Sequence, residues 1–346
     1  MSLKKIAEEL GLSLTTVSRA LNGYPEVAAS TRQAVRDTAA RLHHHPDARA
    51  RGLALGRVGA VGVVLPFGPG SAADLPFLAI ADAMSRHLTQ TGLDLLIVPA
   101  DIRDELPAYR RALETRRVDA FVVTRTRVDD TRLAMLQAEG ALFVAYGRSA
   151  GLAGDYAWFD FEHEAGARLA AARLLDFGHR AFGYIGAAPL YSFAAQRYRG
   201  FVAALADAGA EPDPAAVLRD AFEPRAGYQA MQALLERRRA PTAVLVDNAL
   251  AGAGALQAAR DAGRVPGRDL SVIVCGGPES DGPTSEAITR VDPPDIAGIG
   301  AALASMTLAR LAGMAPSALQ YLAPPVLVPG QTDGPCRASG HRAHGL

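Results

Sequence analysis

The sequence of 346 residues predicts an all-α head followed by an α/β body of two lobes, each built on a parallel sheet. Residues 1–45 show short helical periods separated by glycine, which indicate small packed helices. From residue 58 onward, short apolar runs alternate with helical stretches, the pattern of parallel sheets. So long a run exceeds one ordinary sheet, and we therefore expect two lobes. The predicted units are head 1–45, linker 46–57, body 58–334 and tail 335–346.

Composition places the chain among globular proteins. Hydrophobic residues make up 49% and charged residues 21%, which excludes a disordered or fibrous chain. No apolar run reaches the about 18 residues of a membrane helix, and the N-terminus lacks a signal-peptide pattern. The two cysteines, Cys275 and Cys336, lie too far apart in sequence to suggest a disulfide framework or a zinc site. We expect a cytoplasmic protein with no membrane partner.

The 36 basic and 36 acidic residues are unevenly distributed. Residues 1–57 hold nine Lys or Arg and five Asp or Glu, so the rest of the chain carries an equal acidic excess. A basic head on an acidic body suggests that the head meets a polyanion. Charge alone leaves an ordinary solvated surface equally open.

The head begins with two short helices. Apolar residues at helical spacing predict the first over 3–10, and Gly11 permits the left-handed turn that ends it. Ser13 is a good N-cap for a second helix over 14–21. Two helices joined by a short glycine turn in a basic segment are typical of a helix-turn-helix.

A third helix completes the head. Ser30 and Gln33 are spaced as a capping box, and apolar residues follow on one helical face up to Leu42. The next residues, His43, His44 and His45, do not share a face, so we expect no metal site there.

The second helix would enter the major groove of DNA with its N-terminus first. Leu14 and Thr15 would then reach base edges, with an apolar contact from Leu14 to a thymine methyl group, and Arg19 could bond guanine through two donors. Other polar side chains are better placed to contact phosphates, which position the protein without specifying sequence: Ser13, Thr16, Ser18 and Asn22. A plain three-helix bundle or a protein-binding module is the alternative on these residues alone.

Residues 46–56 could form about two helical turns after Asp47 as cap. So short a helix is unstable alone in water, and Gly52 weakens it further. It should form only where something else holds it; a flexible linker is the alternative.

In the body, apolar runs predict strands and the segments between them predict helices. The expected strands are 58–65, 93–98, 120–123, 142–145, 181–185, 243–246 and 270–274. The expected helices are 75–91, 103–117, 129–139, 162–177, 194–209, 225–238, 249–262 and 294–312. Ligands of such folds bind beyond the carboxyl ends of the strands, which here means between the lobes.

The head resembles that of a known family. The stretch LKKIAEELGLSLTTVSRALN, from Leu3 to Asn22, is similar to the DNA-binding head of the LacI–GalR repressors, and Val27, Thr31, Arg32 and Val35 match its third helix. The resemblance implies a two-fold dimer on a pseudo-palindromic operator. It also implies that 46–56 is a hinge helix that inserts a leucine into the minor groove. Leu53 matches that leucine, Ala50 the small packing residue, and Arg49 can reach phosphate.

The body resembles the effector domain of the same family, which is similar to periplasmic sugar-binding proteins. The stretches RLLDFGHRAFGYIG, RYRGF, FEPRAGYQAM and RAPTAVLVDNALAGAGAL carry this resemblance. Arg197 matches the ligand-binding arginine, a rigid fork of donors for hydroxyls or a carboxylate. The other positions implied to line the ligand site are Phe77 in a loop of the first lobe, Tyr146, Tyr191, Phe193, Phe222 and Asn248. Except for Phe222, plain core packing is an equal alternative for the aromatic residues.

Three positions depart from the family. Ala249 replaces a frequent aspartate, Phe161 a frequent asparagine, and Gly276 stands where many relatives place an aspartate against the ligand. One carboxylate is thus missing, and Asp247 is the candidate to compensate. Arginine, amide, carboxylate and aromatic groups together suit a sugar.

No catalytic motif is present: neither G-x-S-x-G, nor a phosphate-binding G-x-x-x-x-G-K, nor H-E-x-x-H. His87, His163 and His179 lie on expected helices or at their ends, where surface or capping roles are expected. The tail lacks the leucine heptads of tetrameric relatives, which favours a dimer. We expect neither an enzyme nor a bound cofactor.

These observations predict a transcriptional regulator, most simply a repressor, whose operator affinity is set by a small effector. Two alternatives remain open. One is a solute-binding protein or a sugar-processing enzyme; the other is an architectural DNA binder without an effector, suggested by Gly276.

Overall fold

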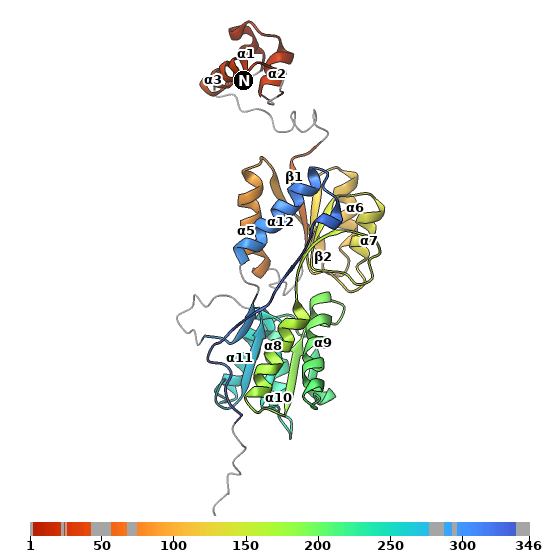
Figure 1. The fold of residues 1–346 in the computed structure, drawn as a ribbon, viewed down its shortest axis with the longest axis vertical. Coiled ribbons are helices and arrows are strands. Elements are labelled where there is room, and N and C mark those ends of the chain that lie inside the picture. Colours follow the sequence, from red (N-terminus) through yellow and green to blue (C-terminus); the bar gives the residue numbers. More distant parts are fainter. Residues whose placement is uncertain are drawn as a thin grey trace, which may run out of the picture.

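The computed structural model describes residues 3–21, 24, 26–42, 57–67, 75–276, 287–292 and 296–336. These residues form a helical head and a body of two α/β lobes (Figure 1). The predicted fold class is confirmed.

The head consists of α1 (Leu3–Leu10), α2 (Leu14–Leu21) and α3 (Ala29–Arg41). Gly11 has φ +63° and ends α1, and the Ser13 hydroxyl accepts a hydrogen bond from Thr16 N at 3.0 Å. The glycine stop and the serine cap are therefore confirmed. One small core holds the helices together, made of Ile6, Ala7, Val17, Ala20, Val27, Val35 and Ala39.

The expected capping box of α3 is wrong. The helix begins one residue earlier than Ser30, with Ala28 at the N-cap position and no side-chain cap. The Gln33 amide instead donates to Asp37 Oδ1 at 2.8 Å. Val27 is buried in the head core, and this tertiary contact explains where the chain turns into the helix.

The first lobe has a six-stranded sheet in the order β11-β5-β4-β3-β1-β2, parallel throughout. Its strands are β1 (Ala60–Phe67), β2 (Asp94–Asp101), β3 (Ala120–Val123), β4 (Phe143–Tyr146), β5 (Ala157–Phe161) and β11 (Gln320–Ala323). Its helices are α5 (Leu75–Thr89), α6 (Leu106–Glu114), α7 (Thr131–Ala138) and α12 (Ile296–Leu311), with a short 3₁₀ turn at Pro316–Ala318.

The second lobe has a six-stranded sheet in the order β12-β10-β9-β8-β6-β7, in which β12 alone runs antiparallel. Its strands are β6 (Phe182–Gly186), β7 (Val217–Arg219), β8 (Ala243–Val246), β9 (Ser271–Cys275), β10 (Arg290–Asp292) and β12 (Val326–Val328). Its helices are α8 (His163–Asp176), α9 (Ser192–Asp207), α10 (Pro224–Leu235) and α11 (Ala249–Asp261), with a 3₁₀ turn at Pro214–Ala216.

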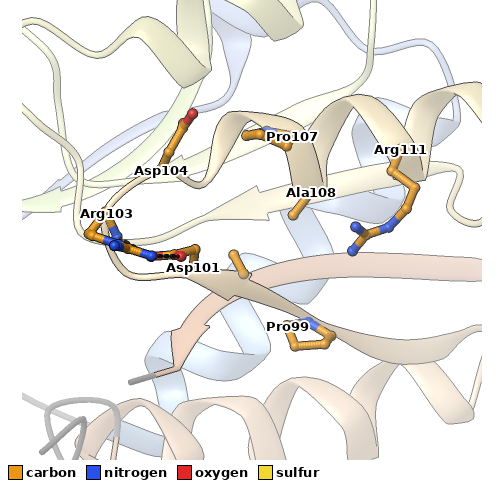
Figure 2. A pocket seen from close by; sticks show the side chains of 8 residues that line it. Pro99, Asp101, Arg103, Asp104, Pro107, Ala108 and Arg111 are labelled. Atoms are coloured by element: carbon orange, nitrogen blue, oxygen red, sulfur yellow. Dashed lines mark hydrogen bonds and ion pairs between the residues drawn. The ribbon is translucent and has the colours of Figure 1, made fainter. Parts of the chain in front are cut away.

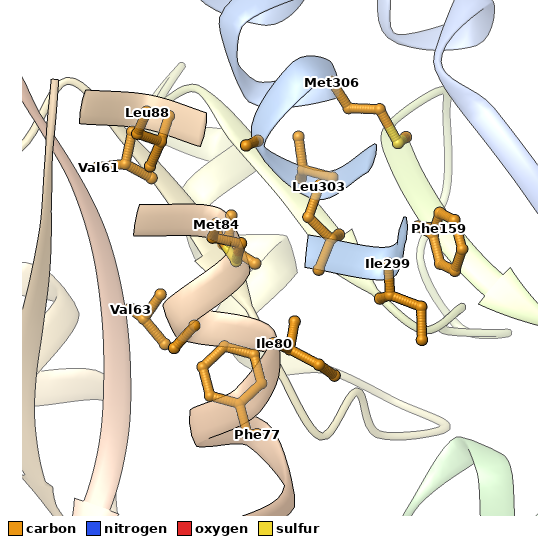
Figure 3. Close-up of a cluster of buried hydrophobic side chains, with 14 of the residues drawn as sticks. Val61, Val63, Phe77, Ile80, Met84, Leu88, Phe159, Ile299, Leu303 and Met306 are labelled. Carbon is orange, nitrogen blue, oxygen red and sulfur yellow. The ribbon is translucent and has the colours of Figure 1, made fainter. Parts of the chain in front are cut away.

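The chain passes between the lobes after β5, after β10 and after β11. Helix α12 therefore returns to the first lobe, where Ile299 and Leu303 pack against Ile80 and Met84 of α5 (Figure 3). Gly300 makes this approach possible, since a Cβ there would lie 2.5 Å from Ala83 Cβ. These crossings place the ends of several strands of both lobes at their junction.

The last described residues pack against the second lobe around His179. His179 is buried there, with its ring nitrogens 2.9 Å from the hydroxyls of Thr242 and Ser271 and 3.0 Å from the Gly334 carbonyl. Cys336 N donates to Phe177 O at 2.8 Å, so contacts with the body continue past residue 334. The expected surface or capping role of His179 is wrong, because folding brings three distant polar groups around its ring.

Acid should weaken this fold through two histidines of the body, His163 and His179. Burial lowers the pKa of His179, and burial with the charge of Arg197 lowers that of His163. Both imidazoles thus bind protons less readily in the folded chain than in the unfolded chain. The free energy of unfolding should be unaffected by these two histidines above their unfolded pKa of about 6.5. Below that pH it should fall, by at most about 1.4 kcal/mol per pH unit for each histidine.

Urea unfolding at pH 7.5 and pH 5.5 measures this effect. The loss of stability between the two values should be smaller in His179→Gln than in the wild type. The control His87→Gln, which changes a half-buried histidine of α5 beside Ser305, should retain the full loss. An identical loss in all three proteins would contradict the assignment.

Candidate DNA-binding face and interlobe site

Helix α2 presents the residues predicted to read DNA. Val17 and Ala20 are buried in the head core, whereas Leu14 is 52% exposed, and Thr15 and Arg19 are exposed as well. Arg19 lies 4.0 Å from the Glu26 carboxylate, and both side chains remain about half exposed. The amphipathic helix therefore leaves its proposed base-reading residues on the outer face.

The residues predicted to contact phosphate are only partly available. The Ser13 hydroxyl caps α2 and lies 2.8 Å from Thr16 Oγ1, while Ser18 is half-buried. Asn22, Arg49, Ala50 and Leu53 lie outside the described residues, so the hinge helix stays a prediction.

An aromatic cluster marks the junction of the lobes. Tyr191 and Phe193 lie at the start of α9, and Phe222 just precedes α10. The Tyr191 ring centroid is 5.8 Å from that of Phe193 and 5.5 Å from that of Phe222, both in stacked geometry, and Phe193 lies 6.1 Å from Phe222. All three follow carboxyl ends of strands, the expected place for a ligand in such sheets.

Two arginines cover this cluster. The Arg197 guanidinium lies 5.1 Å from the Phe193 ring centroid and donates to the Asp247 carbonyl oxygen. Arg125, from the first lobe, lies 5.2 Å from the Phe222 ring centroid. Among the residues that the structure describes, no carboxylate forms an ion pair with Arg197, so its other donors can serve a ligand.

Asp247 and Asn248 have structural partners instead. The Asp247 carboxylate is fully buried and accepts hydrogen bonds from Ala187 N, Tyr184 Oη and Asn248 Nδ2 at 2.9–3.2 Å. Burial raises the pKa of Asp247. Asn248 caps α11 by accepting from Ala251 N at 2.9 Å. Asp247 therefore lies behind the surface and does not compensate for the carboxylate missing at Gly276 in this arrangement.

Phe77 and Tyr146 contribute to cores. Phe77 was expected in a loop lining the cleft, but it lies in α5 and is 7% exposed, packed in the first-lobe core (Figure 3). Tyr146 packs against Phe159 and Phe161, with ring centroids 6.3 and 6.1 Å away, and burial raises its pKa. The first-lobe core therefore accounts for Phe77, whereas Tyr146 is half-buried and its effector contact stays a prediction.

Sequence reasoning missed a polar cluster beside the aromatic one. Asp160, at the end of β5, accepts from Arg148 Nε at 2.7 Å and lies 3.1 Å from His163 Nε2. Arg148 also donates to Gln196 Oε1 of the second lobe at 3.2 Å. Burial opposes the charge of Asp160, but its bonds to His163 and Arg148 outweigh burial and lower its pKa. The expected surface or capping role of His163 is wrong; its spacing of three from Asp160 was the available signal.

Two surface grooves lie away from these residues. One, of about 520 Å³, lies where β2 meets α6, with Asp101, Arg103 and Arg111 in its lining (Figure 2). Arg103 pairs with Asp101 at 2.7 Å and lowers the pKa of that carboxyl to about 2. The other, of about 490 Å³, lies between α10 and α11. Neither contains a predicted effector residue.

Comparison with known proteins identifies the family. Residues 2–47 match the description "Bacterial regulatory proteins, lacI family", and residues 171–332 match "Periplasmic binding protein-like domain". The HTH-type transcriptional regulator RafR of Escherichia coli is 35% identical over 339 residues, which cover 96% of this chain and 98% of RafR. The chain belongs to the lacI family. It is a DNA-binding transcriptional regulator with an effector-binding domain, and not an enzyme.

Two solved structures have folds similar to that of this lacI-family chain. A putative transcriptional regulator from Yersinia pestis is 34% identical, with a TM-score of 0.74 over 81% of this chain and all of that one. The CelR–cellobiose complex is 24% identical, with a TM-score of 0.70 over 96% of this chain and 99% of that one.

Family membership decides between the alternatives drawn from sequence. A solute-binding protein and a sugar-processing enzyme are excluded, because the family consists of transcriptional regulators. In the described part of this lacI-family chain, no group of His, Cys, Asp and Glu is arranged to hold a metal ion. No described helix has the length and apolar character needed to span a bilayer.

Proposed function

We propose that this regulator binds a pseudo-palindromic operator as a homodimer and that a sugar held between its lobes sets its operator affinity, most simply by releasing a repressor. The observation that supports a sugar as the effector is the stack of Tyr191, Phe193 and Phe222, which Arg197 and Arg125 cover. Aromatic faces pack on the C–H faces of sugars, while the guanidinium forks donate to hydroxyls.

In the DNA-binding part of the proposal, α2 enters the major groove. Leu14, Thr15 and Arg19 read bases there, while phosphates contact the polar residues Ser13, Thr16, Ser18 and Asn22. Arg49, Ala50 and Leu53 belong to the proposed hinge, in which Leu53 wedges a base step apart and bends the duplex.

A relative of this fold supports the ligand class. CelR was solved with cellobiose, so a sugar is accommodated by a chain of this architecture. Gly276 stands where many relatives have an aspartate against the ligand, so this chain lacks that carboxylate. We infer that Arg197 makes more of the contacts to sugar hydroxyls as a result.

The deciding experiment selects bound DNA from a genomic library with the full-length chain. Calorimetry with a panel of neutral mono- and disaccharides follows, and then operator binding with and without the sugar that binds. We expect one enriched pseudo-palindrome and one sugar that changes its affinity. An operator with no response to any sugar would overturn the effector proposal and favour the architectural binder.

Replacing Arg19 should remove sequence preference but not DNA binding. Arg19→Ala is expected to cost about 1–3 kcal/mol of discrimination between operator and random DNA, since a bidentate contact to guanine is lost. Binding measured on both DNAs at one salt concentration tests this. Arg36→Ala, which removes an equal charge from exposed α3, should retain the preference. Unchanged discrimination in Arg19→Ala would place base reading elsewhere.

A further inference from the structure

The two lobes are joined by a short backbone ladder as well as by the chain crossings. The loop after β3 in the first lobe meets the segment before α9 in the second. Val128 N donates to Leu190 O and Ser192 N donates to Thr126 O, both at 2.9 Å, around an antiparallel bridge between Arg127 and Tyr191. We call residues 126–128 and 190–192 the interlobe latch.

The loop that forms the latch has an unfavourable backbone conformation. Arg125 has φ +51°, in the left-handed region that costs a non-glycine residue about 1 kcal/mol or more. Such a conformation persists only where the surroundings hold it. The Arg125 carbonyl accepts a hydrogen bond from Arg132 Nη2 at 2.9 Å.

A buried ionic network holds this loop. Arg132, which is 1% exposed, forms a two-point pair with Asp130 at 2.8 and 3.0 Å and donates to Glu105 at 2.7 Å. Glu105 also accepts from Arg127 Nη2 at 2.8 Å, and Asp130 accepts from Arg127 N at 2.9 Å. Two arginines balance two carboxylates, and both carboxylates accept several hydrogen bonds, so the charges of the network are compensated as buried charges require.

The latch and the aromatic cluster share a residue. Tyr191 supplies the bridge to Arg127 and also stacks on Phe193 and Phe222. The loop also places the Arg125 guanidinium 5.2 Å from the Phe222 ring centroid. The backbone of Tyr191 therefore lies between the two hydrogen bonds of the latch, while its ring belongs to the aromatic cluster.

We propose that Glu105, Asp130 and Arg132 are positioning residues that shape loop 124–130 into its half of the interlobe latch, and that Tyr191 links the latch to occupancy of the aromatic cluster. The link to occupancy rests on the proposed function, whereas the latch and its support do not. Together, the interlobe latch and the network that supports it set how firmly the two lobes are held closed.

Ser192 allows a specific test. It is the first residue of α9, and Tyr191 before it has φ −77° and ψ 130°. Proline is favoured at a first helical position and suits an extended preceding residue. Ser192→Pro therefore removes the N–H that reaches Thr126 while keeping the helix start. Ser192→Ala is the matched control, since it keeps the N–H and loses only the hydroxyl that accepts from Gln196 at 3.0 Å.

The measurement is amide hydrogen exchange in the full-length chain, without DNA or sugar. Exchange of the Val128 amide should be about fivefold faster or more in Ser192→Pro, as expected for a lost ladder bond worth about 1 kcal/mol. It should stay near the wild-type rate in Ser192→Ala, and the Leu245 amide in β8 should be unaffected in both. Wild-type exchange at Val128 in Ser192→Pro would overturn the latch.

The supporting network needs its own variant. Glu105→Gln keeps the side-chain shape and removes the charge that joins Arg127 to Arg132. We expect faster exchange at Val128 with unchanged exchange at Leu245. Unchanged exchange at Val128 would overturn the positioning role. Because neither measurement involves an effector or an operator, these outcomes are independent of the proposed function.

Discussion

Replacing Arg132 by methionine is expected to lower the free energy of unfolding by about 3–5 kcal/mol, the cost of removing one partner from a buried ion pair. The methionine would fill much of the volume but would leave the Asp130 and Glu105 carboxylates, 4% and 5% exposed, without their main cation. It would also remove the donor to the Arg125 carbonyl.

Urea denaturation of the full-length chain measures the Arg132 effect. The control is Arg86→Met, because Arg86 pairs with Asp82 at 2.8 Å on an exposed face of α5 and should contribute little. Equal stability of both variants would show that the network does not hold the first lobe together.

Replacing Arg197 by alanine is expected to abolish the effector response while operator binding persists. Its guanidinium covers the Phe193 ring and pairs with no carboxylate of the described residues, and hydrogen bonds from a charged group are worth about 1.5–3 kcal/mol, or roughly 10–150-fold in affinity. The head folds around its own core, so its DNA contacts do not depend on this side chain.

The Arg197 test is a titration of operator release with the sugar found by the panel. Arg199→Ala is the control, since Arg199 lies two residues further along α9, is exposed and pairs with Glu164 at 3.4 Å. A normal response in Arg197→Ala would mean that the effector binds away from the aromatic cluster. Loss of response in both variants would point to α9 as a whole.

The central strands of both sheets could be predicted because each is marked by a run of apolar residues in the local sequence. The strands at 120–123 and 243–246 are continuous apolar runs, and the structure confirms both bounds. The strands that were missed lie toward sheet edges or contain charge: β7, β10, β11 and β12 are only three or four residues long, and β5 contains Asp160. Their pairing depends on neighbouring strands from distant sequence, which no local pattern records.

The candidate site was predicted in part. Arg197, Tyr191, Phe193 and Phe222 do gather at one place, as the family resemblance implied. Phe77, Asp247 and Asn248 have the right residue types, but packing and hydrogen bonds engage them elsewhere. Residue type states what a side chain can bind, whereas burial decides what reaches it.

The helical head, the outward face of α2 and the alternation that builds two mainly parallel sheets could be predicted from the chain alone, because helix and strand periodicity reflect neighbouring residues. The three-dimensional fold was needed to show that α12 and β11 return to the first lobe, that His179 is buried, that His163 lies 3.1 Å from Asp160, and that loop 124–130 pairs with the segment before α9. Those features depend on contacts between residues far apart in the chain, whose free energy exists only once both partners have been brought together by the rest of the fold.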